Sequence, residues 1–140
     1  MKILVPVDGS KSALNAVKYA AKLSSNMRSA DSITLMTVHD DHGLRHAKQL
    51  VGNAAVEDYL REISDKELKS ALSVMKKSGI KYNTIMQTGP VASTISNVAN
   101  KGYDMVVMGT KGRTALADLL IGSVAQRVVA TCKKPVVLVK

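Results

Sequence analysis

The chain has no tryptophan or phenylalanine and one cysteine, Cys132, among its 140 residues. A single cysteine cannot form an internal disulfide, which excludes a disulfide-stapled fold and favours a reducing compartment. No stretch approaches the roughly 18 consecutive apolar residues of a membrane-spanning helix, and the apolar stretch at the N-terminus is too short for a signal peptide. These absences predict a soluble, cytoplasmic protein with no membrane partner.

Acidic residues are scarce relative to basic ones: 11 against 20, for a formal net charge of +9. Such a charge invites a nucleic-acid hypothesis. The lysines are scattered along the chain, however, and the four tyrosines lie too far apart in sequence to form a base-stacking platform. We therefore expect a solvated basic surface without a nucleic-acid partner, and a preference for anionic ligands wherever a binding site exists.

The length fits one domain, residues 1–140, and the composition is that of an ordinary globular protein. Five short apolar segments alternate with segments of helical periodicity. Strands that alternate with helices predict a single α/β domain with a doubly wound parallel sheet and helices on both faces. The predicted strands cover residues 3–7, 33–38, 80–86, 105–108 and 136–139.

Four helices are predicted between these strands. The first is capped by Ser10 or Ser12, and the third follows Pro90. The second covers residues 55–77 and ends at Gly79. It carries two apolar quartets that are out of phase with each other, which predicts a bend or a wide apolar face: Val56, Tyr59, Leu60 and Ile63, then Leu68, Ala71, Leu72 and Met75. The last begins around Gly122. Residues 40–54 are polar and contain glycine, so we expect a surface loop there.

Glycine-containing segments that could bind a ligand follow two of the predicted strands. Strand one leads into Asp8, strand four leads into Gly109 and Gly112, and Gly122-Ser123 opens the last helix. Open α/β sheets bind ligands beyond the carboxyl ends of their strands. Glycine amides and a helix N-terminus there suit a phosphate, to which a cationic side chain at position 111 or 113 can add charge. Alternatively, these glycines serve only a tight turn and a helix cap. The chain has neither a Walker loop nor a G-x-G-x-x-G fingerprint.

These segments resemble the universal stress protein family over essentially the whole chain apart from residues 40–54. The resemblance rests on VPVDGS at residues 5–10, on the G-x2-G-x9-G-S spacing that starts at Gly109, and on PVVLV at residues 135–139. In that family the glycine spacing marks the ATP-binding branch. The resemblance implies an adenine nucleotide alpha-hydrolase-like fold with strand order 3-2-1-4-5.

The resemblance also implies roles for individual residues around bound ATP. One group would line the adenosine and ribose, the other the phosphates, with any Mg²⁺ held mainly by the phosphates themselves. The first group is Pro6, Val7, Asp8, Val38, Met108 and Gly109, and the second is Gly112, Gly122, Ser123, Val124 and Ala125.

A homodimer is the third implication, formed by antiparallel pairing of the strand Val136–Val139 with its copy. The physics of edge strands supports this independently, since a bare apolar edge is an association hazard that two-fold pairing removes.

Catalysis and metal binding have weak sequence support. His39, His42 and His46 lie close together but lack the spacing of a metal site, and Cys132 lies on an apolar helical stripe. Asp8 is the only acid at the predicted site, so no catalytic constellation is evident. The sequence predicts an ATP-binding regulatory protein of the stress response that is not an enzyme. A weak ATP phosphohydrolase using the same pocket and a nucleotide-free dimeric scaffold remain the alternatives.

Overall fold

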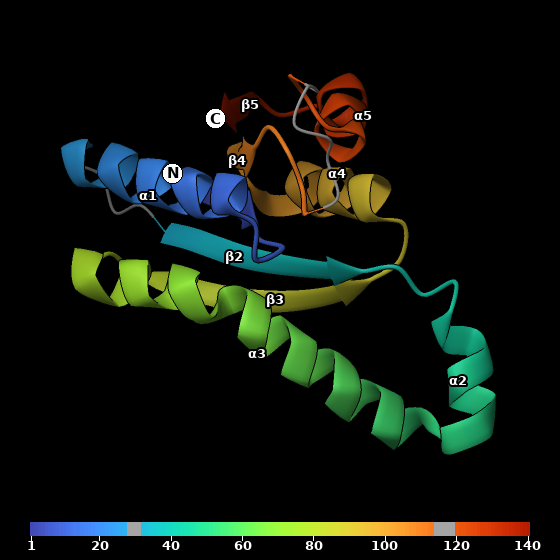
Figure 1. Ribbon diagram of the computed structural model, residues 1–140. Helices are drawn as coiled ribbons and strands as arrows, with labels where there is room; N and C mark the ends of the chain where they lie inside the picture. The colour runs from blue at the N-terminus through green and yellow to red at the C-terminus, as the bar shows by residue number, and fades with distance from the viewer. Residues whose placement is uncertain (28–31, 114–119) are drawn as a thin grey trace.

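A five-stranded parallel sheet forms the centre of the computed structural model, which describes residues 1–27, 32–113 and 120–140 (Figure 1). The strand order is β3-β2-β1-β4-β5, and every neighbouring pair is parallel. This confirms the predicted class and strand order. The strands are β1 (Lys2–Pro6), β2 (Ser32–His39), β3 (Tyr82–Thr88), β4 (Met105–Gly109) and β5 (Val136–Val139).

Helices cover both faces of the sheet, and each face has its own apolar core. Successive strand residues alternate between the two cores: Ile3 and Val5 face α1 and α3, whereas Leu4 faces α4 and α5. A strand covered on both sides must be apolar at consecutive positions, which explains the unbroken apolar runs of the sequence. The helices are α1 (Lys11–Asn26), α2 (Leu44–Val51), α3 (Asn53–Ser78), α4 (Val91–Gly102) and α5 (Ser123–Thr131).

The two candidate capping serines of the first helix have different roles. Ser10 is the N-cap of α1, and its Oγ accepts a hydrogen bond of 3.1 Å from the Ala13 N–H. The Ser12 hydroxyl donates to the Val139 carbonyl at 3.2 Å. The start of α1 is therefore tied to the end of β5, beside the carboxyl ends of the strands.

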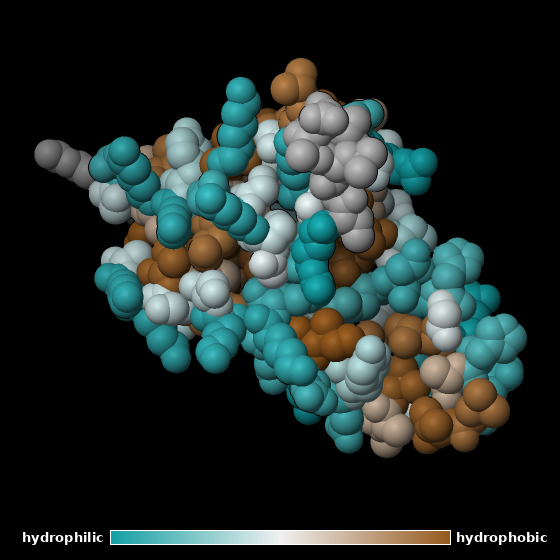
Figure 2. Space-filling view, viewed as in Figure 1, coloured by the Kyte–Doolittle hydropathy of each residue, from teal (hydrophilic) through white to brown (hydrophobic). Residues whose placement is uncertain are grey.

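The predicted surface loop over residues 40–54 is wrong, because Leu44–Val51 forms helix α2. Gly52 follows with φ of 88° and turns the chain into α3. No residue of α2 is buried, and Leu50 and Val51 are 85% and 63% exposed. The apolar residues of α2 therefore do not pack into a core. The helix was not predicted because the prediction relied on the periodicity of buried residues. Figure 1 shows α2 beside the N-terminal end of α3, away from the sheet, and Figure 2 shows apolar surface at this end of the molecule.

The long helix α3 carries one continuous buried stripe that runs through both predicted quartets. Ser64 joins the two predicted quartets, and its hydroxyl lies 2.9 Å from the Thr37 hydroxyl of β2. Tyr59, from the first quartet, is 57% exposed. The buried residues are Val56, Leu60, Ser64, Leu68, Ala71 and Met75.

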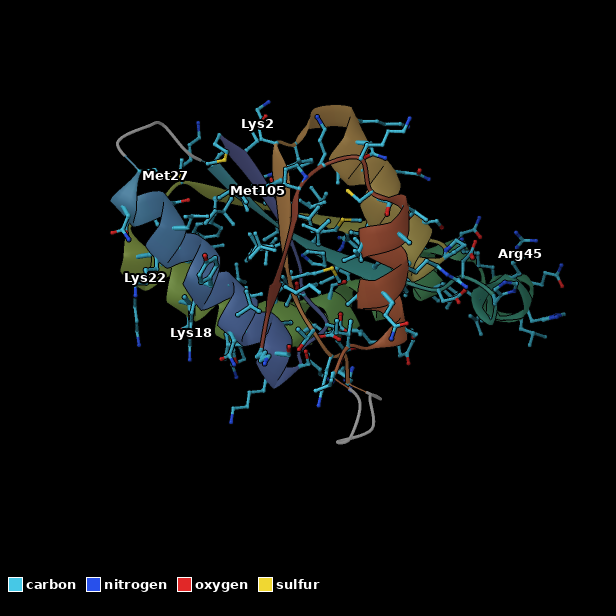
Figure 3. All side chains as sticks on the ribbon, turned by 90° about the horizontal axis from the view of Figure 1, so that it is seen from above. Lys2, Lys18, Lys22, Met27, Arg45 and Met105 are labelled. Carbon is cyan, nitrogen blue, oxygen red and sulfur yellow. The ribbon has the colours of Figure 1, made fainter. Side chains whose placement is uncertain are left out.

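Basic side chains project outward from the sheet's covering helices. Lys18 and Lys22 are exposed and point away from α1 (Figure 3). Within the described ranges, no helix combines the length and apolar character needed to cross a bilayer.

Candidate functional site

A cavity of about 380 Å³ lies at the carboxyl ends of β1 and β4. This is where the strand order reverses, the usual ligand-binding position of an open α/β sheet. The ends of β1, β2 and β4 meet the first turn of α5 there, and α1 and α4 complete the wall. All eleven residues predicted for the site line this cavity, namely Pro6, Val7, Asp8, Val38, Met108, Gly109, Gly112, Gly122, Ser123, Val124 and Ala125.

Gly109, the last residue of β4, packs against the start of α1. A β-carbon on Gly109 would lie 2.5 Å from Ser12 Oγ and 2.7 Å from the Ser12 carbonyl carbon. The second of these atoms belongs to the backbone and cannot rotate away. Glycine is therefore required here, and its absence of a side chain lets the segment after β4 lie directly over the first turn of α1.

Asp8 bridges the crevice between β1 and the segment after β4. Its Oδ1 accepts a hydrogen bond of 2.9 Å from the Ser10 N–H, which fixes the carboxylate. Its Oδ2 faces Gly112, where a β-carbon would come within 3.1 Å of that oxygen. The predicted juxtaposition of Asp8 with the glycine-rich segment is thus present in the structure. Part of the nine-residue spacer between Gly112 and Gly122, residues 114–119, lies outside the described residues.

The N-terminus of α5 provides backbone donors at the other side of the cavity. Gly122 is the N-cap and has no side chain to satisfy the first amides, and its own N–H donates to the Thr110 carbonyl at 2.6 Å. The first intrahelical bond is made by the Gln126 N–H, so the amides of residues 123–125 precede it. Uncapped amides at the positive end of a helix dipole suit an anion, phosphate in particular.

Apart from Lys111, which the sequence indicated as a possible phosphate-facing cation, the rest of the cavity wall was not predicted. Met36 and Ile95 are fully or almost fully buried and make one end of the cavity apolar. Such residues read as ordinary core in a sequence, and no signal marks them as ligand-facing. The cavity therefore has an apolar end suited to a planar base and an amide-lined end suited to phosphate. The additional lining residues are Ala13, Met36, Val91, Ile95, Thr110 and Lys111.

Metal-ligating residues do not gather in the part of the chain that the structure describes. That part holds no group of three or more His, Cys, Asp or Glu side chains able to hold a metal ion. His39 Nε2 lies 3.0 Å from Glu67 Oε2, so this histidine pairs with a carboxylate of α3.

A second hollow, of about 760 Å³, lies at the opposite, amino ends of the strands. Four lysines that are distant in sequence meet there: Lys2, Lys81, Lys101 and Lys134. Figure 3 shows Lys2 well separated from Arg45 of α2. One glycine, Gly102, lines this hollow, and none of its lining residues is buried, unlike those of the smaller cavity. The smaller cavity is therefore the candidate site.

Comparisons with known proteins identify relatives of this chain and of its fold. The model of the universal stress protein family matches residues 1–140. Universal stress protein MJ0531 of Methanocaldococcus jannaschii is 32% identical over 146 aligned positions, covering 99% of this chain and 81% of the relative. The solved structure of MJ0577 from the same organism has 27% identity and a TM-score of 0.83, covering 99% of this chain and 94% of that one.

A solved universal stress protein in complex with cAMP is a further neighbour. It is 25% identical, with a TM-score of 0.62, and the alignment covers 100% of this chain and 97% of the neighbour.

Proposed function

The chain belongs to the universal stress protein family, and on that premise we propose that it is an ATP-binding regulatory protein of the stress response. The observation that carries the proposal is the two-ended cavity at the carboxyl ends of β1 and β4. One end is apolar and the other is lined by glycines and uncapped amides. The cAMP complex of a relative supports an adenine nucleotide as the ligand class.

The apolar end and the amide-lined end of the cavity suit different parts of an adenine nucleotide. Met36, Val38 and Ile95 would enclose the adenine, where burial of an aromatic base is favourable. Asp8 would accept hydrogen bonds from ribose hydroxyls through its Oδ2, because its Oδ1 is already engaged by Ser10. The phosphates would receive hydrogen bonds from the amides of residues 123–125 and approach the backbone at Gly112. Mg²⁺ would be held mainly by the phosphates.

A binding role fits this cavity better than catalysis. Hydrolysis of ATP requires a group that positions or activates water beside the terminal phosphate. Among the described residues, Asp8 is the one acid that lines the cavity, and it lies at the β1 side where the nucleoside is assigned. We therefore propose that occupancy of the cavity, rather than turnover, is the signal.

The edge strand β5 supports the proposed homodimer. Within the described residues β4 is the one strand that pairs with β5, and all four residues of β5 are only partly buried. An exposed apolar edge strand is a template for a further strand. Antiparallel pairing with its copy about a two-fold axis would cover both edges and close the assembly.

A cytoplasmic location is proposed from cysteine chemistry. Cys132 is a free thiol, with its Sγ 3.7 Å from Asn100 Oδ1. A free thiol persists where the environment is reducing.

Mass analysis of nucleotide that remains bound through purification, followed by a turnover assay with ATP, tests the proposal. Retained ATP without turnover supports regulatory binding. Steady release of ADP would instead support the weak phosphohydrolase. A preparation that carries no nucleotide and shows no heat of binding with added ATP and Mg²⁺ would leave only the nucleotide-free dimeric scaffold.

A further inference from the structure

Glu67 is a largely buried carboxylate just outside the candidate site. It lies on α3, and its side chain is 11% exposed. Two basic side chains share it: His39 Nε2 lies 3.0 Å from Oε2, and an Arg113 terminal nitrogen lies 3.4 Å from Oε1. His39 ends β2, whereas Arg113 directly follows Gly112 in the segment after β4. Glu67 therefore joins three separate segments beside the cavity.

The turn that carries Asp8 packs against Glu67. Gly9 has φ of +81°, and a β-carbon there would lie 3.5 Å from Glu67 Cα and 3.6 Å from Cγ. Gly112 approaches the same turn, through Oδ2 of Asp8. Arg113 therefore reaches from the glycine-lined segment, past the Asp8 turn, to α3. Its pair with Glu67 connects the phosphate end of the cavity to the helix that supports α2.

The two partners of Glu67 differ in how deeply they are buried. His39 is 14% exposed and lies at the end of a strand, whereas the Arg113 side chain is 62% exposed. Solvent screens this ion pair on its Arg113 side, because the guanidinium extends into water. Arginine commonly binds phosphate through two charge-assisted hydrogen bonds, whereas the Arg113 contact with Glu67 is a single long bond of 3.4 Å. A phosphate chain that starts at the α5 amides and runs toward Gly112 reaches the segment from which Arg113 projects.

We infer that Arg113 exchanges Glu67 for the terminal phosphates of a bound nucleotide, so that this pair distinguishes a triphosphate from a monophosphate. Glu67 is the positioning residue, because it competes for the guanidinium when the phosphates are absent. When Arg113 moves to the phosphates, the segment after β4 loses this contact with α3. This inference rests on the proposed binding of an adenine nucleotide in the cavity.

Calorimetric affinities for ATP and AMP in four proteins test the exchange: the natural chain, Arg113→Met, Glu67→Gln and the double variant. Arg113→Met should lower ATP affinity about tenfold, the loss expected for a charged hydrogen bond, with AMP affinity unchanged. Glu67→Gln should raise ATP affinity severalfold because the competitor is neutralised. In the Arg113→Met background, Glu67→Gln should have no further effect.

Arg61→Met and Glu62→Gln are matched controls, since both residues are exposed on α3 and should leave the ratio of ATP to AMP affinity unchanged. An unaltered ratio in Arg113→Met, or independent effects of the two substitutions, would overturn the exchange while leaving nucleotide binding intact. Failure of the natural chain to bind either nucleotide would instead overturn the proposed function, and the exchange with it. If circular dichroism shows that Glu67→Gln does not fold, the ratio of ATP to AMP affinity in Arg113→Met tests the inference: an unaltered ratio overturns it.

Discussion

Gly112 lies directly against Asp8, so that a β-carbon at position 112 would come within 3.1 Å of Asp8 Oδ2. The carboxylate cannot easily retreat, because its Oδ1 is bonded to the Ser10 N–H at 2.9 Å. The distance between the β1 turn and the segment after β4 is thus set by the absence of a side chain at position 112.

Gly112→Ala should therefore weaken ATP binding, by about tenfold, because the added methyl displaces either Asp8 or the glycine segment by a few tenths of an ångström. Stability should fall by less than about 1 kcal/mol, since the contacted atom belongs to a side chain. Calorimetry with ATP and denaturant unfolding measure the two effects. Gly43→Ala is the matched control because a β-carbon there meets nothing within 4 Å. Unchanged ATP affinity in Gly112→Ala would contradict this account of the crevice.

Asp8→Asn tests whether Asp8 binds the nucleoside or the phosphates of the nucleotide. The amide keeps an oxygen for the Ser10 N–H, so the turn should remain folded, but the ribose hydroxyls lose a charged acceptor. We expect affinity to fall about tenfold for ATP and AMP alike, in contrast to Arg113→Met, which should affect ATP alone. Competition between the two nucleotides in a binding assay measures this. A loss of affinity for ATP alone would indicate that Asp8 acts on the phosphates rather than on the ribose.

Gly109→Ala should affect stability more than binding chemistry. The β-carbon would overlap the Ser12 carbonyl carbon at 2.7 Å and the Ala13 nitrogen at 2.9 Å, and neither atom can move without shifting α1. Overpacking of this kind costs about 1–3 kcal/mol or more. Urea unfolding gives the value. Gly102→Ala, at the end of α4 with nothing within 4 Å, should be neutral or stabilising by up to about 1 kcal/mol. Equal stability of the two variants would show that α1 and β4 pack less tightly than described.

Much of the fold could be predicted because the sheet is covered on both faces. Burial on both sides imposes consecutive apolar residues on β1, β4 and β5, and such runs are visible in a single sequence. The alternation of strands and helices then leaves few topologies. Helix α2 was missed for the converse reason, since it buries none of its residues and no core requirement shapes its sequence.

The candidate site could be predicted only where backbone geometry restricts the residue type. Gly109 and Gly112 stand out because neighbouring atoms occupy the space of a β-carbon. Glu67 could not be found in this way. It lies on α3, more than 40 positions from Arg113 in sequence, and one glutamate on a charged helix gives no signal of a buried ion pair. Its role depends on which elements the sheet topology brings together.

Val136→Pro tests the proposed dimer at the edge of β5. The carbonyls of Pro135 and Val139 accept hydrogen bonds from β4, so by alternation the N–H groups of Val136 and Leu138 point to the open edge. Proline at 136 would remove one of these donors while keeping the bonds to β4. Analytical ultracentrifugation should show a monomer for Val136→Pro and a dimer for Val136→Thr, which keeps the N–H and the branched shape. A dimer in both variants would place the interface elsewhere.

Gly122→Val tests the phosphate end of the cavity without disturbing the fold. Residue 122 has an extended backbone, with φ of −73° and ψ of 162°, which a β-branched residue adopts readily. Its β-carbon would make ordinary contacts of 3.4 Å with the Thr110 carbonyl oxygen and 3.5 Å with Lys111 Cα. Gly122→Ala should thus lower ATP affinity only slightly. The two further methyl groups of valine would occupy the space beside the α5 amides that a phosphate must enter, so Gly122→Val should reduce ATP affinity at least about tenfold. Circular dichroism should show that the variant is folded. Equal calorimetric affinities for ATP in the valine variant and the natural chain would show that the phosphates do not bind at the N-terminus of α5. Phosphate binding would then not explain the glycine at position 122.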